Sequence, residues 1–158
     1  MLMLSGKELS AKVKEQVAEK CAVFANKFNR KPCLAVILVG DNPASQTYVN
    51  SKKKACEEVG IAHKDFEFES SLSQDKLLEC IDTLNRDDSV DGILVQMPLP
   101  SGIDELTVIN SISPDKDVGG FHPQNIGKLL LGQNSLIACT PKGVLRILYY
   151  YNIDTQGK

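Results

Sequence analysis

The sequence predicts an α/β fold: a three-layer α-β-α domain with a mostly parallel sheet between two layers of helices. Two nearly uninterrupted apolar runs, residues 33–39 and 92–97, are typical of strands buried on both faces of a sheet. Helical patterns precede, separate and follow these runs. Because consecutive parallel strands are joined by right-handed crossovers, this alternation favours helices on both faces of the sheet.

The composition is that of one globular domain. The chain has 158 residues, 42% hydrophobic and 24% charged, which is enough for one core. A net charge of -2 offers no basic surface for nucleic acid, and the apolar run at 33–39 is too short to cross a bilayer. The five cysteines are odd in number and lack C-x-x-C spacing. We therefore expect free thiols in a cytoplasmic protein, without disulfides, a metal site, nucleic-acid binding or membrane insertion.

The first half of the chain alternates helix and strand. Ser5-Gly6-Lys7-Glu8 predicts a capped helix that ends at Lys31-Pro32, with helically spaced apolar residues Leu9, Val13, Val17, Cys21 and Phe24. After the strand at 33–39, Gly40-Asp41-Asn42-Pro43 predicts a turn that begins a second helix, and Gly60 is suited to its C-terminal cap. A short strand is expected at 62–69.

The second half continues the alternation. Ser73 caps a third predicted helix, and Pro98-Leu99-Pro100 ends the strand at 92–97. We expect a helix at 104–112, a loop at 113–125, and a last helix from about Thr140-Pro141 through Tyr151. Ligands of parallel sheets bind beyond the carboxyl ends of the strands. The segments 40–42 and 96–98 are therefore the first place to expect a site.

Lys52 is the first candidate for chemistry. At about 100° per residue, it shares a helical stripe with Ala44, Tyr48, Ala55 and Val59. Burial lowers the pKa of a lysine, and a lysine that titrates near neutral pH can accept and donate protons. The alternative is a side chain whose stem packs on the core while its ammonium stays in water. The helical pattern does not decide between them.

Two further residues accompany this lysine. Tyr48 lies one helical turn before Lys52, so their side chains can touch; it could stack on a flat ligand or be a half-buried core residue. Gln96 interrupts an apolar strand at its carboxyl end and needs partners, which are either Lys52, a ligand or loop backbone. Lys52 is on the order of 13 Å along the helix axis from Pro43, so its reach to Gln96 stays open.

The segment Tyr48-Val49-Asn50-Ser51-Lys52 resembles the Y-x-x-x-K signature of the methylenetetrahydrofolate dehydrogenase/cyclohydrolase family. Other strings resemble the same family in the same order along the chain. They are 39–45 (VGDNPAS), 91–100 (DGILVQMPLP), 114–118 (PDKDV) and 139–143 (CTPKG). A set of this length is far more specific than Y-x-x-x-K alone.

The resemblance implies NADP-dependent oxidation of 5,10-methylenetetrahydrofolate to the methenyl form, and hydrolysis of that form to 10-formyltetrahydrofolate. It makes Lys52 the general acid/base, Gln96 the group that bonds and tunes it, and Tyr48 the ring that stacks on folate. It also implies a homodimer with no metal. The folate-binding positions that it implies are Tyr48, Val49, Asn50, Ser51, Lys52, Val95, Gln96, Met97 and Gly119.

The chain departs from the family in two ways. The family has K-D-V-D-G where this chain has Lys116-Asp117-Val118-Gly119-Gly120, so Gly119 replaces an aspartate that the resemblance assigns to the pterin. Loss of a charged hydrogen-bond partner costs roughly 2–5 kcal/mol, or about 30-fold or more in affinity. Asp117 could substitute, although the family also has that aspartate.

The second departure is the nucleotide site. The eleven glycines contain no G-x-G-x-x-G. We therefore expect a folate-binding catalytic domain at 1–138 and an interdomain helix at 139–158, leading to an NADP-binding domain that is absent here, and no NADP binding by the chain alone. The expected function is an impaired folate enzyme. The alternative is a non-catalytic folate-binding or dimerising remnant.

Overall fold

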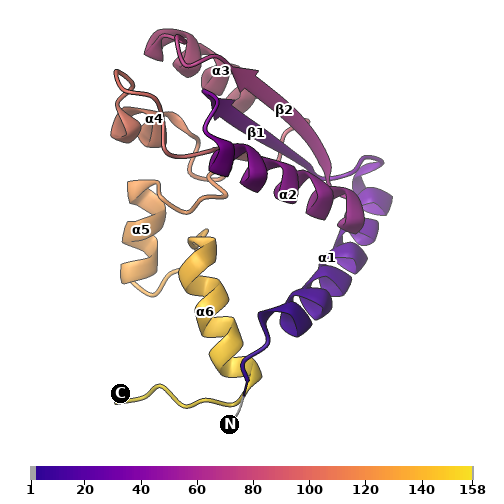
Figure 1. Cartoon of the computed structure of the whole chain (residues 1–158). Coiled ribbons are helices and arrows are strands. Elements are labelled where there is room, and N and C mark those ends of the chain that lie inside the picture. The colour runs from indigo at the N-terminus through magenta and orange to yellow at the C-terminus, as the bar shows by residue number, and fades with distance from the viewer. Residues whose placement is uncertain (1–2, 158) are drawn as a thin grey trace.

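A computed structural model describes residues 3–157 (Figure 1). Residues 1, 2 and 158 lie outside this description. They are the outer ends of the expected catalytic domain at 1–138 and of the expected interdomain helix at 139–158. The elements are α1 (Gly6–Phe28), β1 (Cys33–Val39), α2 (Pro43–Val59), β2 (Ala62–Phe68), α3 (Gln74–Arg86), β3 (Gly92–Val95), α4 (Glu105–Ser111), α5 (Pro123–Leu130) and α6 (Cys139–Tyr150). The expected alternation of helices and strands is confirmed, with one helix, α5, added.

The sheet consists of three parallel strands in the order β2-β1-β3. The central strand β1 pairs with both neighbours, so that Val36 is opposite Asp65 on one side and Leu94 on the other. This position explains why β1 is entirely apolar: six of its seven residues are buried, and neither face meets water. The prediction of a mostly parallel α/β sheet is confirmed.

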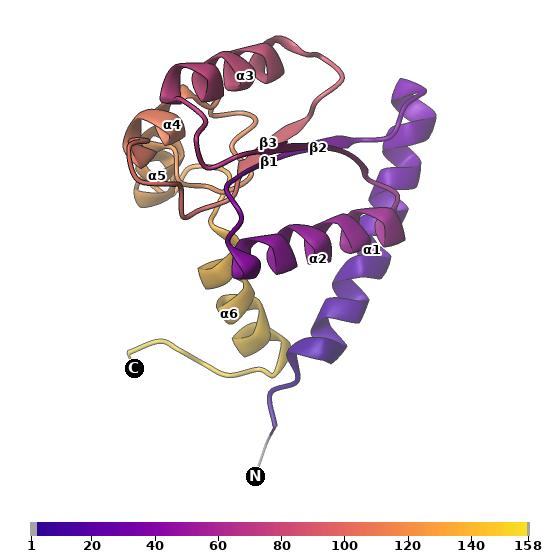
Figure 2. The same ribbon diagram turned by 45° about the horizontal axis from the view of Figure 1, so that its top comes forward.

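Two apolar clusters lie on opposite faces of this sheet. On one face, Ala35, Ile37 and Ile93 pack with residues of α3 and α4, including Leu77 and Val108. On the other face, Val36, Leu38 and Val49 form a smaller cluster that joins β1 to α2. Figure 2 shows the sheet edge-on between α3 and α2, which confirms the three-layer arrangement. Helix α1 lies outside these layers, in contact with α2 and α6.

The buried face of α2 differs from the expected stripe. Its buried residues are Ser45, Val49, Cys56 and Val59, whereas Ala44 and Tyr48 are exposed and Ala55 is half-buried. The expected stripe was therefore rotated by about one residue around the helix relative to the buried face. Alanine and tyrosine are often found on protein surfaces, so their positions were a weak guide to burial. Lys52 fits the observed face by spacing, at positions 45, 49, 52, 56 and 59.

Three boundaries also differ. β3 ends at Val95 instead of continuing to residue 97, and a cis peptide bond joins Met97 to Pro98 just beyond it. Helix α5 begins within the expected loop, where His122 Nδ1 accepts a hydrogen bond from the Gln124 amide and Pro123 occupies the first turn. Histidine is not among the usual capping residues, so the sequence offered little indication that a helix begins here. Helix α6 begins at Cys139, slightly before the expected start.

Candidate active site

The side chains of Lys52 and Gln96 meet at the carboxyl edge of the sheet. Lys52 Nζ donates a hydrogen bond of 2.8 Å to Gln96 Oε1. The Gln96 amide nitrogen in turn donates to the carbonyl of Met97 at 2.6 Å, which fixes the oxygen toward the lysine. The Gln96 backbone still pairs with Ile37 O at 2.8 Å, one residue beyond β3. The lysine therefore does reach the amide, and a short chain of hydrogen bonds orients the pair.

Helix α2 holds Lys52 under the sheet. Asn42 Oδ1 caps the helix by accepting hydrogen bonds from the amides of Ala44 and Ser45, at 3.0 and 3.1 Å. Gly60 ends it with a φ of 82°, a left-handed conformation that glycine adopts without strain. Between these caps, Val49 packs against β1 and brings the following turn, with Lys52, close to the segment after β3.

The environment of Lys52 makes its ammonium less stable than it is in water. Burial lowers its pKa from the ordinary value of 10.5, because a partly desolvated ammonium is less stable than an ammonium in water. A weaker opposing influence comes from Cys139, whose thiolate form would raise this pKa. The lysine is thus held by a neutral amide instead of a carboxylate, which leaves its proton available for transfer.

Tyr48 is exposed beside this pair. Its ring centroid lies 5.3 Å from Lys52 Nζ, within the range of a cation–π contact. The residue is 63% exposed, so it is not a core tyrosine. An exposed ring next to a partly buried lysine offers a flat surface on which an aromatic ligand can stack.

The other expected ligand positions are distributed differently. Val49 and Val95 are buried in the two clusters on opposite faces of the sheet, whereas Asn50 and Ser51 are exposed on α2. Met97 is half-buried, and its carbonyl holds Gln96. The contacts therefore bring together Tyr48, Lys52 and Gln96, while the two valines support this set from the core.

The loop at 117–122 has a separate anchor. Asp117 is buried and accepts hydrogen bonds from the amides of Gly120 and His122 at 3.1 and 2.8 Å, and from Asn125 Nδ2 at 3.1 Å. Both of its carboxylate oxygens are thus committed to the loop. Asp117 is therefore poorly placed to substitute for the carboxylate that Gly119 lacks.

The two adjacent glycines of this loop are not equivalent. Gly120 has a φ of 70°, and a Cβ there would lie 2.5 Å from the backbone nitrogen of Ala138, so only glycine fits. Gly119 is not among the residues with positive φ. A Cβ there would meet Phe121 Cδ2 at 3.0 Å and Asp117 Oδ1 at 3.3 Å. Since the Phe121 side chain is more than half exposed and can move, position 119 can accept a larger residue.

Cys139 is the site neighbour that the sequence analysis did not single out. It is exposed at the start of α6, close enough to Lys52 to influence the pKa of that lysine. The sequence analysis includes it only in the string 139–143 that resembles the family, because its position in the sequence does not link it to α2. All five cysteines are free in the structure.

Within residues 3–157, no group of three or more potential metal-ligating side chains occurs. In the same part of the chain, no helix combines the length and apolar character that crossing a membrane requires.

A parallel α/β domain with a partly desolvated lysine hydrogen-bonded to an amide at the carboxyl edge of its sheet has the arrangement expected of a proton-transfer site. The family model for the tetrahydrofolate dehydrogenase/cyclohydrolase catalytic domain matches residues 4–119, and the chain belongs to this family.

Individual relatives agree with this assignment. A bifunctional protein FolD from Sulfurihydrogenibium sp. (strain YO3AOP1) is 51% identical over the whole chain, which covers 56% of that protein. The crystal structure of the bifunctional enzyme FolD from Campylobacter jejuni superimposes with a TM-score of 0.95 at 53% identity, covering 100% of this chain and 56% of that one. The chain thus spans about half the length of these relatives.

A more distant structure has the same fold. The methylenetetrahydrofolate dehydrogenase-cyclohydrolase (FolD) of Trypanosoma brucei, solved with NADP cofactor and an inhibitor, superimposes with a TM-score of 0.94 at 29% identity. It aligns with 99% of this chain and 54% of its own.

Proposed function

We propose that the chain binds a tetrahydrofolate derivative and hydrolyses 5,10-methenyltetrahydrofolate to 10-formyltetrahydrofolate, with Lys52 as the general acid/base. The observation that carries this proposal is the 2.8 Å hydrogen bond between Lys52 and Gln96, together with the lowered pKa of the lysine. Tyr48 supplies the ring against which the substrate stacks, and Gln96 orients the lysine.

The reaction needs one group that first accepts and then donates a proton. Water adds to the one-carbon bridge of the methenyl substrate, and neutral Lys52 takes a proton from this water. The bond from the bridge carbon to one ring nitrogen then breaks and the lysine returns the proton to that nitrogen, while the hydroxyl on the bridge carbon releases its own proton to solvent as the formyl C=O bond forms. Because a neutral amine is needed at the start, the partial burial that lowers the pKa of Lys52 favours this role.

The oxidation of 5,10-methylenetetrahydrofolate by NADP is the second activity that we propose for the full-length protein of this family. The residues of this chain do not fit a dinucleotide: no glycine pair has the G-x-G spacing that lets a backbone approach a pyrophosphate. In this proposal the chain contributes the folate side of that reaction, and the hydride acceptor lies against residues that this chain does not supply.

The cyclohydrolase proposal is tested by following the absorbance decay of methenyltetrahydrofolate with this chain and its Lys52→Ala variant. We expect the wild-type chain to accelerate the decay and Lys52→Ala to reduce the rate to that of buffer. Lys54→Ala is the matched control, since Lys54 is an exposed lysine two residues away. Equal rates for the wild-type chain and Lys52→Ala would exclude the enzymatic proposal.

A second candidate function is a folate-binding or dimerising remnant without catalysis. Gly119 favours it, because the carboxylate expected to hold the pterin is missing and Asp117 is committed to the loop. Folate binding by calorimetry without any Lys52-dependent turnover would support the remnant. Turnover that depends on Lys52 would contradict it.

Homodimer formation and a cytoplasmic location remain part of the same proposal. The five free thiols are compatible with a reducing compartment. Sedimentation velocity across a range of concentrations tests dimerisation: a stable dimer keeps the sedimentation coefficient of two chains, a monomer keeps that of one chain, and a non-specific association gives a coefficient that rises with concentration.

A further inference from the structure

The Phe121 ring lies over the backbone of Gly119, in the space that a side chain at position 119 would need. A Cβ at Gly119 would lie 3.0 Å from Cδ2 and 3.5 Å from Cε2 of this ring. Gly119 is not among the residues with positive φ, so its backbone conformation does not itself require glycine. The missing side chain at position 119 is therefore what allows the ring to lie this close to the loop.

The ring is packed against the loop but is still largely open to solvent. Phe121 is 53% exposed, close to the 52% of Phe28 at the end of α1. Within residues 3–157, Phe28 lies against Phe24 with 4.5 Å between the ring centroids, whereas Phe121 takes part in no aromatic or cation–π pair. A flat apolar ring without an aromatic partner offers a surface on which an aromatic ligand can stack.

The backbone on both sides of Phe121 is held in place. The buried carboxylate of Asp117 accepts hydrogen bonds from the amides of Gly120 and His122, at 3.1 and 2.8 Å. Gly120 also lies against Ala138, so closely that a Cβ on Gly120 would be 2.5 Å from the Ala138 nitrogen. An anchored loop thus carries the ring, and a ligand that contacts the ring need not order this backbone first.

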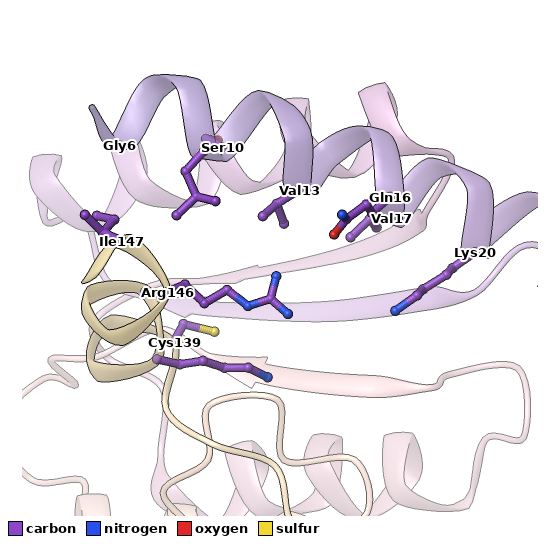
Figure 3. A pocket seen from close by; sticks show the side chains of 12 residues that line it. Gly6, Ser10, Val13, Gln16, Val17, Lys20, Cys139, Arg146 and Ile147 are labelled. Carbon is purple, nitrogen blue, oxygen red and sulfur yellow. The ribbon is translucent and has the colours of Figure 1, made fainter. Parts of the chain in front are cut away.

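This loop borders the candidate active site. Ala138 precedes Cys139, which is close enough to Lys52 to influence the pKa of that lysine. Figure 3 shows the Cys139 side chain pointing into the hollow between α1 and α6 that it helps to line. In Figures 1 and 2, the start of α6 lies near the first part of α2, which carries Tyr48. Phe121 and Tyr48 are therefore two exposed rings near the same edge of the sheet.

We propose that Phe121 is a second aromatic binding residue for the folate substrate, and that its ring supplies an apolar contact where position 119 has no side chain of its own. The inference rests on the proposed function, in which the flat ring system of the substrate stacks on Tyr48. Contact with Phe121 buries apolar surface of both partners and involves no charge. Substrate affinity should therefore depend on this ring, and the dependence should be the same at low and at high salt.

Calorimetry with 5-formyltetrahydrofolate tests this contact. Phe121→Ala should weaken binding about tenfold, a factor typical of removing one aromatic ring that stacks on a heterocycle. Phe121→Tyr keeps the ring and should bind like the wild type. Phe28→Ala is the matched control, because Phe28 is equally exposed on a different element, and it should leave the affinity unchanged.

A fluorescence titration reports on the same contact directly. The chain contains no tryptophan, so Phe121→Trp introduces a single indole at this position. Its emission should change as 5-formyltetrahydrofolate is added, with the dissociation constant that calorimetry gives. Phe28→Trp, titrated under the same conditions, should show no change beyond light absorption by the ligand.

The contrary outcomes separate this inference from the proposed function. Unchanged affinity in Phe121→Ala would overturn the role of Phe121 and leave the proposed function standing. An emission of Phe121→Trp that does not respond to bound ligand would do the same. If the wild-type chain binds no folate, the proposed function fails and this inference fails with it. Circular dichroism checks the fold of each variant, and if Phe121→Ala does not fold, the comparison of Phe121→Trp with Phe28→Trp decides the proposal.

Discussion

Lys52 Nζ and Gln96 Oε1 are 2.8 Å apart, although one belongs to the third turn of α2 and the other follows β3. A neutral amide satisfies the ammonium without adding charge, so the cost of desolvation is not offset by an opposite charge. This explains why burial can lower the pKa of the lysine while its hydrogen bond is retained.

Replacing the amide by a carboxylate should reverse this effect. In Gln96→Glu, an opposite charge at hydrogen-bond distance stabilises the ammonium, so the pKa of Lys52 should rise above its wild-type value. NMR titration of isotope-labelled, dimethylated lysines measures this directly, with Lys54 as a reference in the same molecule. Hydrolysis near neutral pH should slow because less neutral lysine is present. An unchanged midpoint for Lys52 would show that Gln96 does not set its environment.

The lowered pKa of Lys52 also has a consequence for stability. The unfolded chain binds the proton of Lys52 more tightly than the folded chain does, so the charged lysine destabilises the fold below its folded pKa. This destabilisation disappears as the pH rises from the folded pKa toward 10.5. Lys52→Met should therefore unfold at a higher urea concentration than the wild type at pH 7, and this advantage should shrink at high pH. Lys54→Met, on the exposed side of α2, should show no such trend.

Gly119→Asp should tighten folate binding. The carboxylate restores the partner that the family resemblance assigns to the pterin, which is worth roughly 2 kcal/mol or about 30-fold in affinity. Phe121 must shift, since the new Cβ would lie 3.0 Å from its ring, so a small loss of stability is expected. Calorimetry with a folate analogue measures the gain, and Gly119→Asn separates charge from size. Wild-type-like affinity in Gly119→Asp would contradict the assigned role.

The fold was easiest to predict where both faces of an element are buried. β1 is apolar at every position because both of its faces are covered, and such a run has few alternatives. Helix α2 was predicted by its caps, Asn42 and Gly60, but its buried face was displaced. Alanines and a tyrosine matched the helical period without being buried, and only the cluster with Val36 and Leu38 shows which side meets the sheet.

The residues of the candidate site could be predicted from the sequence, but most of the contacts between them could not. Tyr48 and Lys52 are neighbours on one helix, so their contact followed from spacing. The reach of Lys52 to Gln96 depends on the crossover that lays α2 against β1, next to the strand that Gln96 follows, and no local pattern contains it. The approach of Cys139 depends on the start of α6, which follows α5, a helix that the sequence analysis did not predict and that begins within the expected loop.

Asp117 should be essential to the loop that carries Gly119. It accepts three hydrogen bonds within a buried site, and Asp117→Ala leaves these donors unpaired. We expect a loss of about 3 kcal/mol or more in the free energy of unfolding, measured by urea denaturation. Asp115→Ala, an exposed neighbour, is the control and should change stability by less than about 0.5 kcal/mol. A loss in Asp117→Ala no larger than that of the control would show that the loop does not depend on this carboxylate.

Asp87 links β2 to the end of α3 and should contribute stability that depends on pH. Its carboxylate accepts hydrogen bonds from Lys64 Nζ at 2.8 Å and from the amide and hydroxyl of Ser89 at 2.8 and 2.6 Å. These bonds, the one from Lys64 first, hold the pKa of Asp87 well below its ordinary value of 3.8. Because the folded pKa is the lower one, the stabilisation is complete above the unfolded pKa and is lost as the pH falls toward the folded pKa.

Asp87→Asn should therefore be less stable than the wild type at pH 7, and the difference should narrow as the pH falls below about 4. Urea denaturation at pH 7, 5 and 3 measures it. Asp88→Asn removes the same charge from the adjacent exposed residue and should leave stability nearly unchanged at each pH. A constant difference between wild type and Asp87→Asn at all three values would mean that the contribution of Asp87 is packing, not charge. A stability difference that narrows as the pH falls would assign the contribution of Asp87 to its ionised carboxylate, which accepts hydrogen bonds from Lys64 and Ser89.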